Sequence, residues 1–328
     1  MQQKNIAVVI AAFNAQNTID IAIRSALEEP ETAEVIVVDD ASSDHTPSVV
    51  QTICNKDDRV KLIVQEKNQG PSAARNVAIQ NSSSPLIAIL DADDIILPGR
   101  FARLLKIQDW DFIADNIAFC ENFDQIAQVN ELQSLHELTY DDSIAFDLAQ
   151  FVYANISDTK RVRGELGFLK PVMRRDFLEA HQLKYEESCR LGEDFLFYCY
   201  ALSVGARLKL IYSCGYAALI RADSLSGQHS LEDLRALHSQ SIKLTRDFAN
   251  LPLAHVAMQK HARSILRRIH HREVLQVKKE HGAFAGVIEA IKKPTAILDI
   301  LKDRTTSRSA PNITPRLLFT KSDLEDFV

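Results

Sequence analysis

Residues 87–94 read Ile-Ala-Ile-Leu-Asp-Ala-Asp-Asp, an apolar run that ends abruptly in acidic residues. A buried strand that carries Asp91 and Asp93 at its C-terminal end is costly, because close carboxylates repel each other and each prefers water. A divalent cation that bridges such carboxylates to phosphate oxygens relieves this cost. The stretch therefore predicts a site for a metal-bound phosphate or diphosphate. The alternative is a solvated turn before Leu97-Pro98.

Residues 6–110 alternate apolar runs with segments of helical periodicity. The run at 6–12 is continuous, as in strands buried on both faces of a parallel sheet. Repeated strand–helix–strand units imply an open α/β sheet with right-handed crossovers. The pattern predicts strands at 6–12, 34–38, 60–64 and 86–90, and helices at 18–28, 43–52 and 72–80.

Polar residues follow three of the predicted strands, at 13–14, 39–40 and 91–93. Ligands of open parallel sheets bind beyond the carboxyl ends of the strands, so we expect these residues to line one crevice. Asp40 could accept a hydrogen bond from a base or bind ribose hydroxyls, or it could belong to the cap of the next helix. Gly70 to Asn76 places small residues and Arg75 at a helix start, which suits an anion but is also ordinary helix punctuation.

Composition places the chain among ordinary globular proteins. It has 328 residues, enough for one large domain with an extension or for two domains. The net charge of −6 gives no reason to expect a nucleic-acid partner. Five cysteines without a paired motif fit a reducing compartment. With no signal peptide and no apolar run long enough to span a bilayer, we expect a cytoplasmic protein, or one bound to the inner face of the cell membrane.

Charge is unevenly distributed along the second half of the chain. Residues 107–159 contain eleven Asp and Glu but no Lys or Arg, whereas residues 251–310 contain 12 Lys and Arg against 5 Asp and Glu. Basic amphipathic helices could lie on anionic lipid and give a peripheral membrane contact. The alternative is that these helices simply pack onto the rest of the protein.

Four motifs in residues 5–105 resemble, in order and spacing, the inverting family-2 glycosyltransferases of the GT-A fold. They are 8–14, 37–42, 70–76 and 90–94. The resemblance implies a nucleotide-diphosphate-sugar donor, commonly a UDP-sugar, and a divalent metal, Mn²⁺ or Mg²⁺. For the nucleoside, it implies that Ala11, Phe13 and Asn14 line the base pocket, that Asp40 pairs with the base and that Arg75 borders the nucleotide. For the rest of the donor, it implies that Asp91 reaches the ribose and the metal, and that Asp93 reaches the metal and the diphosphate. Ala92 is implied to lie at the donor.

The family also uses a carboxylate base about 100 residues after the Asp91-Ala92-Asp93 motif, often in a Glu-Asp pair. Glu193-Asp194 lies at that spacing. The resemblance implies that Asp194 takes the proton of the acceptor hydroxyl, with Glu193 beside it. An acidic helix N-terminus is the alternative. Arg221 is a candidate for diphosphate contact, although Asp223 stands where many bacterial members have a histidine.

The resemblance implies a Rossmann-like, mostly parallel sheet flanked by helices. We expect a catalytic domain at 1–230, with a nucleotide-sugar half at 1–105 and an acceptor half at 106–230. A helical extension is expected at 231–328. The implied activity is transfer of one sugar to a saccharide or lipid-linked saccharide, in exopolysaccharide assembly of the succinoglycan type. The oligomeric state is left open.

Two other functions stay open at this point. A phospho-receiver regulator would use similar acidic strand ends, but residues 107–159 lack the lysine it needs. A donor-binding but inactive homologue would keep the same motifs. A dinucleotide dehydrogenase is disfavoured, because no Gly-x-Gly-x-x-Gly follows the first strand.

Overall fold

The structure is a computed structural model, and it describes residues 5–134, 143–156, 166–220, 230–293, 295 and 315–319. Strand β1 (Ile6–Ala12) lies inside its sheet. It pairs in parallel with β2 (Thr32–Asp39) on one side and with β4 (Leu86–Asp91) on the other, and β3 (Val60–Val64) extends the sheet beyond β2. The register sets Ala12 opposite Asp39 and Ala11 opposite Asp91. The ends of three strands therefore meet at one edge, as the sequence predicts.

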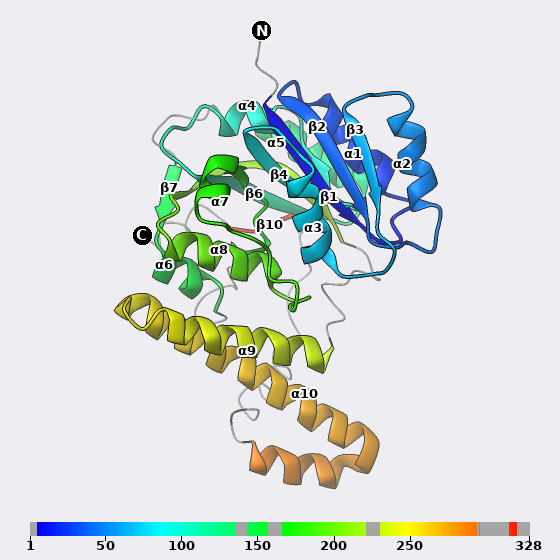
Figure 1. The fold of residues 1–328 in the computed structure, drawn as a ribbon. Helices are drawn as coiled ribbons and strands as arrows, with labels where there is room; N and C mark the ends of the chain where they lie inside the picture. Colours follow the sequence, from blue (N-terminus) through cyan, green and yellow to red (C-terminus); the bar gives the residue numbers. More distant parts are fainter. Residues whose placement is uncertain are drawn as a thin grey trace.

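The helices between these strands also match the predicted pattern. They are α1 (Ile19–Glu28), α2 (Thr46–Cys54) and α3 (Pro71–Gln80), and they pack around the parallel strands (Figure 1). The predicted start of the second helix at residue 43 is wrong by three residues. Asp44 instead accepts hydrogen bonds from the backbone N–H groups of Gln16 and Thr46, so residues 42–45 form a loop docked against the end of β1.

Short antiparallel strands join this half of the sheet to a second one. Strand β8 (Val172–Arg174) lies between β4 and β6 (Phe112–Cys120), and β6 runs parallel to β9 (Leu208–Leu219). The described residues thus form one ten-stranded sheet, parallel in its longest pairings. The remaining elements around it are β5 (Ile95–Ile96), α4 (Arg100–Leu104), α5 (Phe123–Ser134), β7 (Ser143–Phe146), α6 (Leu148–Ala154), the 3₁₀ turn η1 (Leu166–Phe168), α7 (Arg175–Ala180), α8 (Glu193–Ser203) and β10 (Arg316–Leu317).

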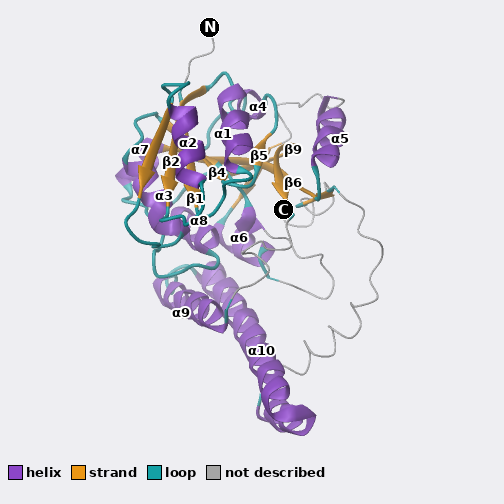
Figure 2. Ribbon diagram, turned by 90° about the vertical axis from the view of Figure 1, so that its right-hand side faces the viewer, coloured by secondary structure: helices purple, strands orange, loops and turns teal. Residues whose placement is uncertain are grey.

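Two long helices, α9 (Leu231–Asp247) and α10 (Pro252–Lys292), lie beyond α6 and α8 (Figures 1 and 2). Helix α10 packs on α9 and α6 through buried residues from Ala254 to Val274. Its backbone breaks at Gly282, where φ is 87°. Throughout the part of the chain that the structure covers, no helix has both the length and the apolar character that crossing a membrane requires.

A buried ion pair fills the centre of the second half-sheet. Arg100 is fully buried and pairs with Asp115, their closest N–O distance being 2.9 Å. Gly215 of β9 lies against both side chains, and a Cβ atom at this position would overlap Arg100 Cγ and Asp115 Oδ2. Only glycine lets β9 approach the pair this closely.

Gly215→Ala should therefore destabilise the fold by roughly 2–3 kcal/mol, because the added methyl group forces the ion pair to move. Gly205→Ala is the control, since open space surrounds Gly205 and only its φ of 92° opposes a side chain. We expect about 1 kcal/mol for the control. Urea unfolding measures both values, and equal losses would refute this account of Gly215.

Candidate active site

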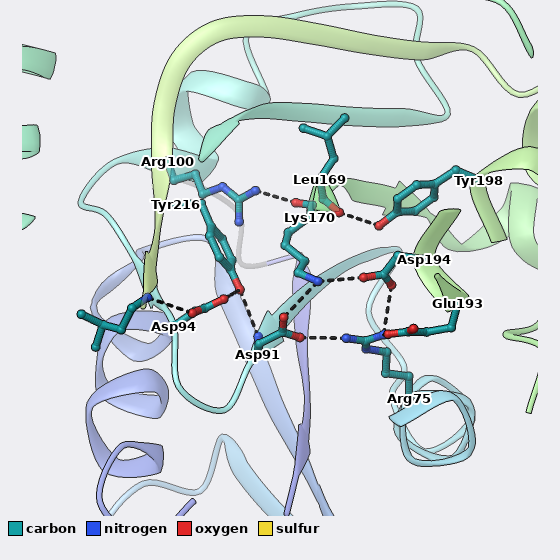
Figure 3. Close-up of polar contacts among 11 residues, drawn as sticks. Arg75, Asp91, Asp94, Arg100, Leu169, Lys170, Glu193, Asp194, Tyr198 and Tyr216 are labelled. Atoms are coloured by element: carbon teal, nitrogen blue, oxygen red, sulfur yellow. Dashed lines mark hydrogen bonds and ion pairs between the residues drawn. The ribbon is translucent and has the colours of Figure 1, made fainter. Parts of the chain in front are cut away.

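Asp91 ends β4 and is held there by two cations (Figure 3). Arg75 Nη2 of α3 donates to Asp91 Oδ1 at 2.8 Å, and Lys170 Nζ lies 3.0 Å from Asp91 Oδ2. Burial opposes the ionised form of Asp91, but Lys170 and Arg75 outweigh it and hold its pKa well below the usual range. Asp91 is therefore a carboxylate whose charge is already compensated.

The same two cations hold the first residues of α8. Arg75 Nη1 donates to Asp194 Oδ1 at 3.0 Å and to Glu193 Oε1 at 2.9 Å, while Lys170 Nζ donates to Asp194 Oδ2 at 2.7 Å. Gly192 precedes the helix with a φ of 72°, a left-handed conformation that favours glycine. Asp91, Arg75, Asp194 and Lys170 form a closed ring, called here the four-residue ring (Figure 3).

Glu193 differs from Asp194 in its surroundings. Glu193 pairs with Arg75 at 2.9 Å, whereas Asp194 pairs with both Arg75 and Lys170 (Figure 3). Burial and the adjacent Asp194 charge raise the pKa of Glu193. Glu193 therefore holds a proton more readily than a free carboxyl group does, and such perturbed groups are frequent at functional sites.

Lys170 was missed in reasoning from the sequence. Its backbone is fixed from two sides, because Arg100 Nη2 donates to the carbonyl of Lys170 and the Tyr198 hydroxyl donates to the carbonyl of Leu169 at 2.7 Å. Burial would lower the pKa of Lys170, but Asp194 and Asp91 raise it, so the side chain stays charged. The available signal was a lysine in an apolar segment, between Leu169 and Pro171.

Asp94 turns away from the ring toward β9. Its Oδ2 accepts from the Tyr216 hydroxyl at 2.8 Å, and the same hydroxyl accepts from the backbone N–H of Asp91 at 3.1 Å. Burial and the charges of Asp91 and Asp93 raise the pKa of Asp94 well above the ordinary value. Tyr216 and Asp94 therefore fix the end of β4, and the crowded negative charge marks a place where a cation would be favourable.

Oxygen ligands for a cation are available at this strand end. Hard cations such as Mg²⁺ and Mn²⁺ bind through one or two carboxylates and complete their coordination with water and substrate phosphates. Among the residues that the structure describes, no cluster of three or more His, Cys, Asp or Glu forms a self-contained metal cage. Asp93 beside Asp91 fits a metal that is shared with a diphosphate, and does not fit one held by protein alone.

The ends of β1 and β2 supply a second wall of the site. Phe13 is 46% exposed, and Asn14 adopts a φ of 50° while its Oδ1 accepts from the backbone N–H of Ser43. Both oxygens of Asp40 accept backbone N–H groups, from Gln69 at 2.7 Å and from Gly70 at 2.8 Å. Asp40 thus fixes the loop that leads into α3 and Arg75.

The predicted site residues fall into three groups. Arg75, Asp91, Glu193 and Asp194 come into direct contact. The β1, β2 and β4 strand ends at this edge carry Ala11, Phe13, Asn14, Asp40, Ala92 and Asp93, which are not in the ring. Arg221 lies outside the described residues. The ligand that each residue binds stays a prediction.

Comparison with known proteins identifies the family. The model of "Glycosyl transferase family 2" matches residues 7–157. Succinoglycan biosynthesis protein ExoU of Rhizobium meliloti is 42% identical over 315 residues, which cover 95% of this chain and 91% of that protein. The chain belongs to glycosyl transferase family 2. This glycosyltransferase is also 36% identical, over 31% of its length and 33% of the other's, to a Campylobacter jejuni enzyme named GalNAc(5)-diNAcBac-PP-undecaprenol beta-1,3-glucosyltransferase.

Solved structures give the same fold. TarS residues 1–349 of S. aureus, crystallised with UDP-GlcNAc, align with a TM-score of 0.56 at 16% identity and cover 88% of this glycosyltransferase and 92% of that chain. The mannosyltransferase PcManGT of Pyrobaculum calidifontis, in complex with GDP-Man and Mn²⁺, also aligns with a TM-score of 0.56 at 16% identity and covers 94% and 81%. The predicted GT-A fold is confirmed, and the phospho-receiver alternative is wrong.

Lys170→Met tests the four-residue ring, because it keeps the apolar stem and removes the charge. At neutral pH we expect the free energy of unfolding to fall by roughly 3 kcal/mol, because Asp91 and Asp194 are left with one shared cation, Arg75, in place of two. Urea unfolding followed by circular dichroism at several pH values measures the deficit.

This deficit should shrink at acid pH. The folded pKa of Asp91 lies below its unfolded value, so its stabilisation is present above about pH 4 and is lost as the pH falls through the folded pKa. Lys61→Met is the control, since Lys61 is exposed and pairs with Glu34 at 3.5 Å. The control should lose less than about 1 kcal/mol. A Lys170→Met deficit that grows toward acid pH would contradict the ring.

Proposed function

We propose that the chain transfers one sugar, with inversion, from a UDP-sugar to a saccharide carried on a lipid diphosphate, in the assembly of a surface polysaccharide. The main support for this proposal is a pair of shared cations. Arg75 and Lys170 each contact Asp91, at the predicted donor end, and Asp194, at the predicted acceptor end. Support for the donor comes from TarS, crystallised with UDP-GlcNAc, and support for the acceptor from the name of the Campylobacter enzyme. Succinoglycan synthesis by the 42% identical relative supports the pathway.

Asp194 is proposed as the base that takes the proton of the acceptor hydroxyl while the hydroxyl oxygen attacks the anomeric carbon. Both of its oxygens accept from cations in this structure. Each oxygen keeps a further lone pair, which is proposed to accept from the acceptor hydroxyl while both cations keep the charge of Asp194 compensated. Glu193 holds Arg75 in place during this step.

Asp93, together with Asp91, is proposed to hold a divalent metal against the donor diphosphate. Such a metal offsets the negative charge that develops on the departing diphosphate. Arg75 and Lys170 already occupy both oxygens of Asp91, which makes Asp93 the stronger metal-ligand candidate of the pair. Arg221 is proposed as a further diphosphate contact.

The exposed wall at the strand ends is proposed to receive the nucleoside. Phe13 offers an exposed ring, while Ala11 and Asn14 lie at the same strand end. Asp40 is proposed to meet the base, and its two backbone contacts set the direction in which its remaining lone pairs point. A lipid-linked acceptor would be met at a membrane surface, and we propose that the basic C-terminal helices contact that surface.

Asp194→Asn should bind donor but fail to transfer. We expect the rate of UDP release from UDP-glucose, in the presence of an undecaprenyl-diphosphate saccharide, to fall by roughly 10²–10⁴-fold. Calorimetry should give a donor affinity within about threefold of wild type, because the donor contacts are kept. Glu193→Gln is the comparison, and its rate of UDP release should fall less.

If Glu193→Gln is the more damaging change, the base assignment moves to Glu193. Loss of transfer in both wild type and variants would support the inactive homologue.

Asp93→Asn should remove the metal-dependent part of donor binding. UDP with Mn²⁺ is expected to raise the melting temperature of wild type by several degrees, and UDP with a chelator by much less. The variant should show the smaller shift under both conditions. Asp58→Asn, an exposed acid on another loop, is the control and should behave as wild type. An unchanged Mn²⁺ effect in Asp93→Asn would contradict the proposed ligand.

A further inference from the structure

The far end of α10 carries a row of exposed apolar side chains. Phe284 is 79% exposed, Val287 58%, Ile288 42% and Ile291 70%. These positions are spaced as i, i+3, i+4 and i+7, so the four side chains share one face of the helix after Gly282. We call these four residues the distal apolar face. Figures 1 and 2 show this end of α10 extending away from the sheet.

The opposite face of the same segment is the one that contacts the protein. Gly286 lies against Lys278, where a Cβ atom would approach Lys278 Cβ to 2.8 Å. Lys293 Nζ pairs with Glu273 at 2.7 Å and with Glu289 at 2.7 Å. A helix that packs on its own protein normally turns its apolar face inward. Here the small and polar side faces inward, so the distal apolar face is left for a partner outside the described residues.

The charges around this face indicate what the partner is. Residues 278–293, which surround this face, contain four Lys against two Glu. Lys278 and Lys279 are exposed just before the break at Gly282, and the exposed Lys292, which lies 3.6 Å from Glu289, follows Ile291 in the chain. A second copy of this arm would bring like charges together, which opposes pairing of two arms. A partner that is both apolar and anionic could bury the four apolar side chains and also pair with the lysines.

We propose that the distal apolar face lies in the interface of an anionic phospholipid bilayer, with the lysines among the headgroups. Amphipathic helices bind bilayers in this way, by burying an apolar face beneath the headgroups while basic side chains meet anionic lipid. The packed part of α10, from Ala254 to Val274, holds the arm to α6 and α9. The inference deepens the proposed function by naming the partner surface, and rests on that function only for its biological purpose.

Co-sedimentation of the full chain with vesicles of phosphatidylcholine and phosphatidylglycerol tests the proposal. Wild type should bind these vesicles, bind pure phosphatidylcholine weakly, and dissociate as salt is raised. Phe284→Ser combined with Ile291→Ser should weaken binding at least roughly tenfold, because two large side chains no longer enter the bilayer. Leu253→Ser is the matched control, because Leu253 is 73% exposed but lies at the opposite end of α10. The control should bind as wild type does.

Three results would overturn the proposal. Wild type could fail to bind the anionic vesicles, or the double variant could bind as tightly as wild type. Light scattering could instead show a dimer that the double variant dissolves, which would assign the face to a second copy. Transfer to a soluble saccharide should be equal in wild type and double variant. Loss of vesicle binding is thereby distinguished from failure of the proposed transfer reaction.

Discussion

Two carboxylates, the buried Asp194 and the partly exposed Asp91, share the same two cations, and the site depends on this arrangement. Asp91 ends a strand of the parallel half-sheet, while Asp194 begins a helix of the second half. Arg75 and Lys170 each contact both acids, so neither half of the site can move without disturbing the other. Buried charges are tolerated only when they are compensated and hydrogen-bonded. The ring meets this requirement and sets the two carboxylates at a fixed spacing.

Backbone contacts explain why the ring can hold its geometry. Tyr216 and Asp94 fix the end of β4, while Arg100 holds the carbonyl of Lys170 and Tyr198 holds the carbonyl of Leu169. Asp40 fixes the loop that leads to Arg75. These supports are themselves buried polar groups with hydrogen-bond partners, which is how a rigid scaffold positions residues that meet a substrate.

The sequence alone was sufficient for the parallel half of the fold. Continuous apolar runs and helical spacing predict its strands and helices, and strand ends identify Asp91. The contact of Arg75 with Asp194 spans 119 residues, and the family resemblance predicts a role for each residue but not their contact. Lys170 stands in a short segment without periodicity, and its role comes from tertiary packing alone. The basic character of α10 is visible in the sequence, but the outward orientation of its distal apolar face depends on the break at Gly282.

The most direct test of this account is a crystal structure of the chain with Mn²⁺ and a non-hydrolysable UDP-sugar analogue. Inversion requires the base and the leaving diphosphate to lie on opposite sides of the anomeric carbon. The account predicts the diphosphate at Asp91 and Asp93, with the Asp194 carboxylate facing the anomeric carbon from the other side. A diphosphate bound away from the end of β4, or an Asp194 carboxylate on the same side as the leaving group, would contradict it.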